Sequence, residues 1–159
     1  MKLLLDLNKS ADTIIIDTNI RNKVGQSALW IASNGCSKGH RKCVELLLSE
    51  CTVDVNLGDH MNNTPLLVAC ASRGPEQTAI VKLLLAVDGI DPNVNNRQLH
   101  APLLLASHQG NVEVVSKLLT LDGIEINHID EDGDSGNAII IIISITIIIN
   151  TVITYPYSY

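Results

Sequence analysis

The stretch that decides the fold is Thr64–Asn96, TPLLVACASRGPEQTAIVKLLLAVDGIDPNVNN. Thr64 can cap a helix with its side-chain oxygen. Pro65 fits the first position of that helix, because the N–H that proline lacks would have no helical partner there. Gly74 and the proline after it end this short apolar helix, and a second helix follows. Four residues form the apolar face of the second helix: Ile80, Val81, Leu84 and Leu85. Such a pair cannot bury its apolar face alone, so we expect it to be one unit of a stack.

The same unit occurs three times along the chain. Starts of the first helix lie 37 residues apart, at Ser27, Thr64 and Ala101. The second helix is repeated at Cys43–Leu48, Ile80–Leu85 and Val114–Leu119. A pattern of an acidic residue, any residue and an asparagine precedes the three units at Asp17, Asp54 and Asp91, and recurs after the third unit at Glu125. A period of this length, with two helices and a turn per unit, indicates a solenoid.

These residues resemble the ankyrin-repeat family. SALW at 27–30, TPLL at 64–67 and APLL at 101–104 look like its TPLH signature, and Gly110–Val115 looks like its glycine followed by the second helix. The resemblance runs from Asp17 to about Asp134. It implies an all-α fold, a helix-turn-helix repeat solenoid of about three repeats with a leading half-repeat, followed by an irregular Ile-rich C-terminal tail.

The chain departs from the family pattern in two ways. The fourth residue of the signature is Trp30, Leu67 or Leu104 instead of histidine, so we expect the polar link between neighbouring repeats to be absent. The first two repeats carry about three extra residues, which we place between their helices, around Cys36–Gly39 and Gly74–Gln77.

We divide the chain into a repeat domain and a tail. Met1–Leu7 matches the end of a second helix with no first helix before it, so the chain begins in a half-repeat or is cut from a longer array. The expected parts are a half-repeat and connector (1–24), repeat one (25–61), repeat two (62–98), repeat three with the start of a fourth (99–134), and an uncharged tail (135–159).

Three interpretations of the tail stay open. Ten isoleucines lie between Ile139 and Ile153 and leave no polar helical face. The apolar run 138–153 is slightly shorter than the roughly 17 to 25 residues of a spanning helix, which weakens a membrane anchor. The alternatives are a segment that covers the end of the stack and an aberrant tail from an altered reading frame. An uncharged, β-branched run is an aggregation hazard if exposed.

Composition and charge narrow the classes of partner. The net charge is −6, and the one basic cluster is His40-Arg41-Lys42, which argues against nucleic acid as a partner. Leu3–Leu5 is too short for a signal peptide. We expect an intracellular, cytoplasmic protein, with the nucleus and a membrane surface as open alternatives; a membrane contact would depend on the C-terminal tail.

The sequence gives no sign of catalysis, and we expect no cofactor. It lacks GxSxG, GxxxxGK and HExxH patterns. The four cysteines, Cys36, Cys43, Cys51 and Cys70, have no CxxC spacing and are expected to be free thiols, which also argues against a zinc site. The acidic stretch 130–134 lacks the closing glutamate of a calcium loop.

What remains is a surface for binding another protein. In ankyrin repeats, as the resemblance implies, the concave face and the connectors bind partner proteins, and we expect Asn22 and Lys23 to be displayed there too. Trp30 is the sharpest candidate contact, although packing between repeats is its alternative role. The candidate partner-binding residues are Trp30, Asn34, Asp59, His60, Arg73, Asn96, Arg97, His108 and Gln109. The partner's identity stays open, and the alternative function is an adaptor held at a membrane by the Ile-rich tail.

Overall fold

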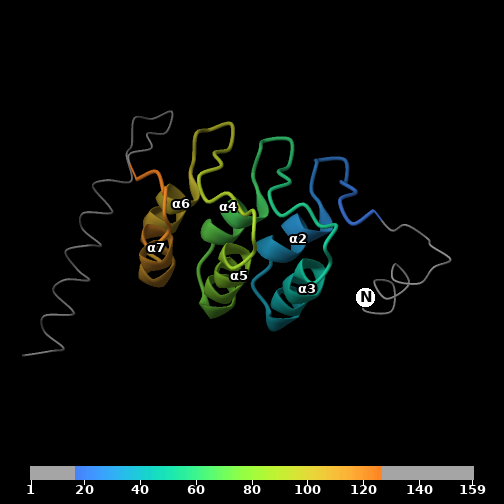
Figure 1. Ribbon diagram of the computed structural model, residues 1–159, viewed down its shortest axis with the longest axis horizontal. Helices are drawn as coiled ribbons and strands as arrows, with labels where there is room; N and C mark the ends of the chain where they lie inside the picture. The colour runs from blue at the N-terminus through green and yellow to red at the C-terminus, as the bar shows by residue number, and fades with distance from the viewer. Residues whose placement is uncertain (1–16, 127–159) are drawn as a thin grey trace, which may run out of the picture.

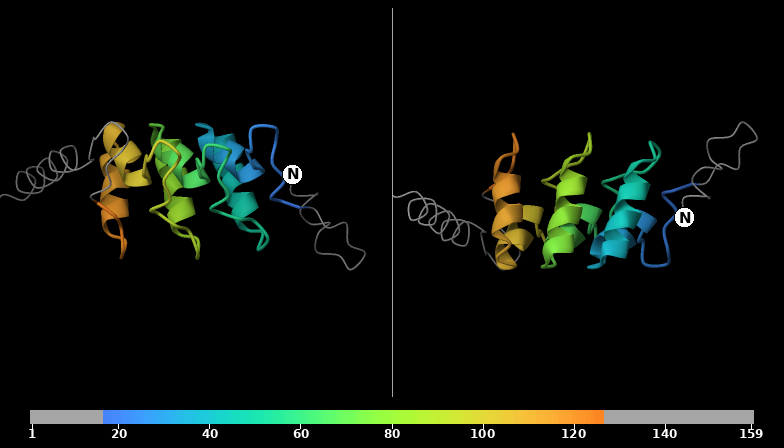
Figure 2. Two further views of the ribbon diagram at one scale, coloured as in Figure 1. Left: turned by 90° about the horizontal axis from the view of Figure 1, so that it is seen from above. Right: turned by 90° about the horizontal axis from the view of Figure 1, so that it is seen from below.

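The computed structural model describes residues 17–126, which form helices and no strand. The helices come in three pairs, stacked side by side in one row (Figure 1; Figure 2). The first helix of each pair is here called inner and the second outer. The inner helices are α2 (Ala28–Asn34), α4 (Pro65–Cys70) and α6 (Pro102–His108). The outer helices are α3 (Lys38–Leu48), α5 (Pro75–Leu85) and α7 (Val112–Leu119). The predicted all-α repeat solenoid is therefore confirmed.

Side-chain caps explain where the inner helices begin. The Thr64 Oγ1 atom accepts a hydrogen bond from the Leu67 amide at 3.2 Å, and Ser27 caps α2 in the same way. Such a cap satisfies one of the amides that a helix leaves without a partner at its start. Ala101 makes no side-chain cap at the start of α6, because an alanine side chain has no hydrogen-bond acceptor.

The core runs through the stack as one layer of aliphatic side chains. Each inner helix packs against its own outer helix and against the next inner helix, and neighbouring outer helices also pack together. Fully buried members of this core include Leu29, Val44, Leu66, Ile80, Leu84, Val115 and Leu118. No pair closes a core alone, so each repeat depends on its neighbours.

The extra residues of the first two repeats lie in the outer helices, and the prediction that they lengthen the turns is wrong. Helices α3 and α5 have 11 residues each, whereas α7 has eight. Ser37 caps α3 before Lys38, and Pro75 is the first residue of α5, so each helix starts almost one turn earlier.

Three asparagines 37 residues apart, Asn19, Asn56 and Asn93, join successive repeats and are here called the asparagine ladder. The Asn56 side chain donates to the Gly89 carbonyl at 2.7 Å and accepts from the Asp91 amide at 2.9 Å. Asn19 and Asn93 make the equivalent pair of bonds to the backbone of the following repeat. The side chains therefore set the register between repeats through backbone groups alone.

The acidic residue two positions earlier holds each ladder asparagine in place. The Asp54 carboxylate accepts from the Asn56 amide at 3.0 Å, and Asp17 and Asp91 do the same for Asn19 and Asn93 at 2.9 Å. This local turn explains the Asp-x-Asn pattern in the sequence.

Trp30 supplies a polar link between repeats one and two, so the prediction that this link is absent is wrong for repeat one. The indole Nε1–H donates to the Asn63 carbonyl at 2.8 Å, and the side chain is buried. The equivalent Leu67 and Leu104 are buried without a polar group to donate. A tryptophan can thus carry both the packing and the hydrogen bond expected of the family's histidine.

Several predictions concern residues outside the described part of the chain. These are the half-repeat helix at Met1–Leu7, the acidic stretch 130–134 and the tail 135–159. Among residues 17–126, no helix is both long enough and apolar enough to cross a bilayer.

Candidate functional site

Each connector ends in a tight loop that the chain builds in the same way three times. These loops, residues 22–26, 59–63 and 96–100, are here called the tips. The first residue of each tip, Asn22, Asp59 or Asn96, accepts hydrogen bonds through its side-chain oxygen from the amides two and four residues later, at 2.9 to 3.0 Å. Asparagine and aspartate favour such turns because their short side chains reach the following backbone.

Backbone hydrogen bonds join the tips into a continuous row. The His60 amide donates to the Val24 carbonyl at 3.3 Å, and the Arg97 amide donates to the Met61 carbonyl at 2.9 Å. At Gly25 the chains approach so closely that a Cβ would lie 2.7 Å from the His60 nitrogen. With its positive φ of 87°, this position requires glycine. The tips are therefore a preorganised edge of the molecule.

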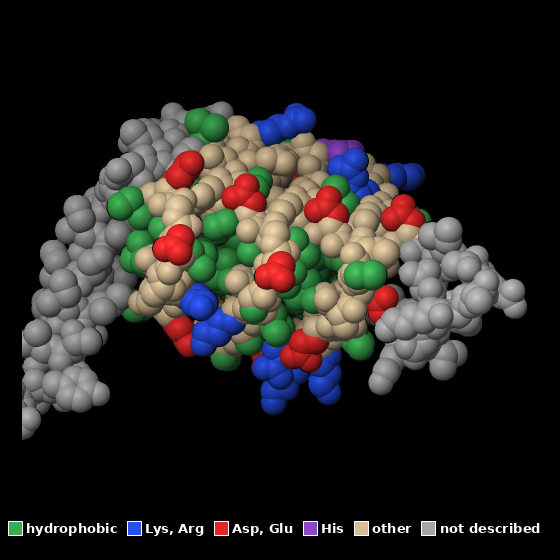
Figure 3. Space-filling model, in the orientation of Figure 1, with side chains coloured by type: hydrophobic (Ala, Val, Ile, Leu, Met, Phe, Trp, Pro, Cys, Tyr) green, Lys and Arg blue, Asp and Glu red, His purple; other side chains and the backbone are tan. Residues whose placement is uncertain are grey.

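The tips display charged and apolar side chains that the core does not use. The second residue of each tip, Lys23, His60 or Arg97, is exposed. Val24, Met61 and Leu99 are large apolar residues of the tips with 43 to 55% of their surface exposed. In Figure 3 one group of lysine, arginine and histidine side chains lies along the upper edge, where the tips lie, above a row of acidic side chains, and further lysine and arginine side chains lie along the lower edge.

The ends of the inner helices add polar side chains on the turn side of the stack. Asn34 and His108 are the last residues of α2 and α6, and both are exposed. They lie 74 residues apart, twice the 37-residue spacing of the inner helices, so they occupy equivalent positions of repeats one and three. Ile31, on α2, is also exposed although it is apolar. These side chains take no part in the core and are available to a partner.

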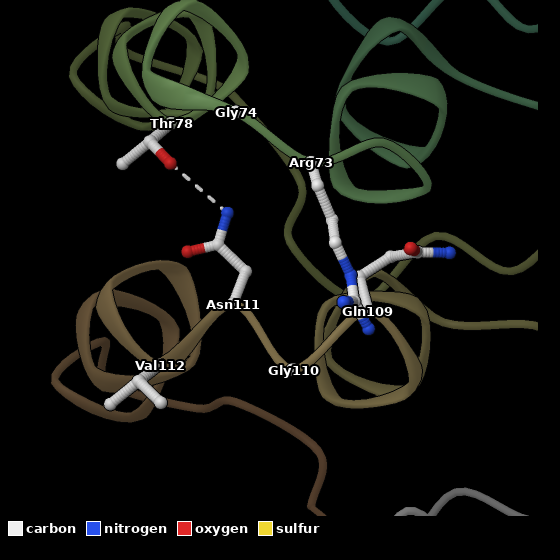
Figure 4. A pocket seen from close by; sticks show the side chains of 7 residues that line it. All are labelled: Arg73, Gly74, Thr78, Gln109, Gly110, Asn111 and Val112. Carbon is white, nitrogen blue, oxygen red and sulfur yellow. Dashed lines mark hydrogen bonds between the residues drawn. The ribbon is translucent and has the colours of Figure 1, made fainter.

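A small polar pocket opens between the turns of repeats two and three (Figure 4). Its volume is about 270 Å³. On one side, the Asn111 Nδ2 group donates to Thr78 Oγ1 at 3.0 Å. On the other, the Arg73 side chain extends beside Gln109 and over Gly110. The pocket thus brings together two of the predicted contact residues, Arg73, which is exposed, and Gln109, which is half-buried.

Two predicted contact residues are buried, so the prediction that they are displayed is wrong. Trp30 is 9% exposed because it packs between repeats one and two. Asn96 is 7% exposed, since its oxygen holds its own tip and its Nδ2 group donates to the Asn63 side chain at 2.9 Å. Asp59 is half-buried, with both carboxylate oxygens accepting from the Asn63 amide group. These three side chains serve the scaffold around the site.

The remaining predicted residues form two groups. His60 and Arg97 lie in the row of tips, whereas Arg73 and Gln109 lie at the pocket, with Asn34 and His108 at the ends of inner helices. The apolar tip residues Val24, Met61 and Leu99 are not among the contact residues predicted from the sequence. Each of them lies within a few residues of the asparagine or aspartate that begins a tip, and a side chain in such a turn lies away from the core. Their place in the sequence could therefore have indicated that they are exposed.

The four cysteines differ in their exposure to solvent. All four are free; Cys36 and Cys51 are exposed, and Cys70 is buried. Burial raises the pKa of the Cys70 thiol to about 12, which keeps it protonated and unreactive near neutral pH. Within residues 17–126, no three His, Cys, Asp or Glu side chains gather in a way that could hold a metal ion.

The repeated helix pairs and the tips define a helix-turn-helix repeat protein. Comparison with protein families matches residues 1–96 to ankyrin repeats, in three copies, and residues 99–131 to a further ankyrin repeat. The chain therefore belongs to the ankyrin-repeat family, whose repeats are in general protein–protein interaction modules. A search of curated proteins returned no match.

Proposed function

We propose that this protein is a non-catalytic interaction module that binds a partner protein through its tips and the adjoining inner-helix face. The observation that carries the proposal is the row of exposed apolar residues, Val24, Met61 and Leu99, on loops held together by backbone hydrogen bonds. A solvent-exposed row of large apolar side chains that adds nothing to the core is typical of a binding surface.

The rigidity of the tips favours binding. Each tip is closed by its own Asx hydrogen bonds and tied to the next by a main-chain bond. A surface that is ordered before binding loses little conformational entropy when the partner arrives. The inner-helix ends, with Asn34 and His108, and the pocket beside Arg73 extend the same surface with polar groups that can fix a partner's orientation.

The proposed cellular compartment depends on the cysteines, whereas the alternative of a membrane-tethered adaptor depends on the C-terminal tail. Four free thiols support a reducing, intracellular compartment, and we propose the cytoplasm. The alternative of a membrane-tethered adaptor depends on the tail 135–159, which lies outside the described residues, and stays a prediction. The net charge of −6 supports a protein partner over nucleic acid.

A display selection followed by crosslinking tests the proposal. The full chain is used to select binders from a random peptide library, and a photoreactive phenylalanine analogue is placed at Met61, His108 or Lys42 in separate samples. Met61 lies on a tip and His108 on an inner helix, whereas Lys42 lies on the outer helix α3 and serves as the control. Crosslinks from Met61 and His108 are expected. No selectable binder, or crosslinks from Lys42 alone, would overturn the proposal.

A further inference from the structure

The tips carry positive charge in a protein that is acidic as a whole. Lys23, His60 and Arg97 occupy the same position of the three tips, 37 residues apart. Asp59 is the one acidic side chain of the tips, and it is turned into its own loop by bonds to Asn63. The outward charge of the row is therefore positive, although the whole chain carries −6.

The basic side chains of the tips have no acidic partner within the described residues. On the outer helices, by contrast, Arg41 pairs with Glu76 and Lys82 pairs with Glu113, each across two repeats. Among residues 17–126, the ion pairs within 4.0 Å do not involve Lys23, His60 or Arg97. Two unpaired cations, Lys23 and Arg97, on either side of His60 on a fixed scaffold favour an acidic partner, because complementary charge raises the association rate and selects the register.

Each tip also carries a large apolar residue. Val24 follows Lys23 in the first tip, Met61 follows His60 in the second, and Leu99 lies two residues after Arg97 in the third. Leu99 has a φ of 59°, a conformation that costs a side-chain-bearing residue free energy, whereas Gly25 and Asn62 occupy the equivalent positions. The Leu99 side chain is 43% exposed, so burial in the core does not compensate for that cost. Strain of this kind at an exposed position points to a role in binding.

The repeat distance sets the spacing that a partner must match. Packed helices lie about 8–10 Å apart, so neighbouring tips are separated by about that distance. A segment in the extended polyproline II conformation advances about 3.1 Å per residue with three residues per turn, so three residues span one repeat and return the side chain to the same face. An extended segment lying along the row would present every third side chain to successive tips.

We propose that the tips bind an extended segment of a partner protein that carries an acidic residue at every third position, with apolar residues between. This inference rests on the interaction function proposed above and adds the chemistry of the partner. The carboxylates face Lys23, His60 and Arg97, and the apolar side chains cover Val24, Met61 and Leu99. Single-stranded nucleic acid also carries evenly spaced negative charge, but exposed apolar tips and only two permanent cations favour a peptide.

The test measures binding of fluorescein-labelled peptides to the full chain by fluorescence anisotropy. The probe is Glu-Leu-Ser repeated four times, and the comparison peptide has the same composition with its four glutamates in one block. A thymidine 12-mer serves as the nucleic-acid probe. We expect saturable binding of the repeated peptide, at least about fivefold weaker binding of the block peptide, and no preference for the oligonucleotide.

Matched variants assign the binding to the tips. Lys23→Glu with Arg97→Glu is expected to weaken the repeated peptide about tenfold or more, and the control pair Lys42→Glu with Lys117→Glu, exposed on outer helices, by less than about twofold. Leu99→Asn should weaken it several-fold without unfolding the chain. Equal affinity of the two peptides, equal loss in both variant pairs, tighter binding of the oligonucleotide, or no binding at 1 mM peptide would each overturn the inference.

The two proposals can fail separately. If the library selection yields peptides that crosslink to Met61 and His108 but lack the acidic spacing, the partner chemistry proposed here is wrong and the interaction function stands. If the selection yields no binder, the interaction function itself fails.

Discussion

The two ends of each connector repeat with the same period but use their side chains in opposite ways. At one end, the asparagine ladder has the same residue in every copy, and each side chain is bonded to the next repeat. At the other end, the second tip position holds Lys23, His60 or Arg97, and these side chains extend into solvent. The ladder position therefore keeps one residue type, whereas the second tip position, which faces outward, differs from copy to copy.

Comparing the copies within this one chain therefore distinguishes the ladder position, which is structural, from the second tip position, which is exposed. A ladder asparagine must donate and accept in one fixed geometry, and no other uncharged side chain of that length does both. A tip side chain needs only to avoid disturbing the loop. The comparison yields four predictions, ordered from the largest expected change in stability to the smallest.

Removing the central ladder asparagine should destabilise the stack most. Asn56→Ala deletes the bonds to the Gly89 carbonyl and the Asp91 amide and leaves both groups without that partner. We expect the free energy of unfolding to fall by about 2 kcal/mol, measured by urea denaturation followed by circular dichroism. Arg97→Ala is the control at the other end of a connector. A loss below about 0.5 kcal/mol would show that the ladder is not a structural device.

Trp30 tests whether a residue expected at the surface belongs to the scaffold. Trp30→Phe keeps an aromatic ring in the buried site but removes the hydrogen bond to the Asn63 carbonyl. We expect a loss of about 1–1.5 kcal/mol in the same denaturation experiment, with helical signal retained. A neutral substitution that instead weakened partner binding would return Trp30 to the binding surface.

Leu99 tests whether an exposed tip residue lowers the stability of the fold. Leu99→Asn places a residue that tolerates positive φ at a position where φ is 59°, and we expect the free energy of unfolding to rise by about 0.5–1 kcal/mol. The neighbouring Gln98→Asn should bring no gain, because φ is not positive there. If Leu99→Asn lowers the thermal midpoint, the leucine side chain stabilises the fold and the strain argument is wrong.

The charged tip residues should matter least for stability. Lys23→Ala and Arg97→Ala remove exposed side chains with no ion pair among the described residues, so each should change the free energy of unfolding by less than about 0.5 kcal/mol. Thermal melts at low and high salt provide the measurement. A larger loss in either variant would place these side chains with the scaffold and remove the contrast between the two ends of the connector.

Much of the fold could be predicted from the sequence because its signals are local and repeated. The leucine runs of the outer helices and the Asp-x-Asn pattern each occur in all three repeats, and a Ser or Thr cap begins two of the three inner helices. The extra residues of repeats one and two were misplaced, because the sequence does not show where a helix starts when either a serine or a proline permits an earlier first turn.

The candidate site was harder to predict because exposure depends on neighbouring repeats. Trp30 and Asn96 belong to residue types common at binding surfaces, yet both are buried by contacts with Asn63, 33 residues away. Nothing in the sequence near either residue indicates that contact. His60 and Arg97 were predicted correctly as exposed, since a charged or polar residue beside a turn-forming one has no buried alternative.

The asparagine ladder has a consequence for how such a chain can lengthen during evolution. The hydrogen bonds of each ladder side chain to the following copy go to main-chain atoms, namely the Thr52, Gly89 and Gly123 carbonyls and the Asp54, Asp91 and Glu125 amides. Any copy of the unit can offer those atoms, whatever its outward residues are. A gene segment encoding one unit could thus be duplicated or exchanged as a cassette, and its outward positions could then diverge while the joint between units stayed intact.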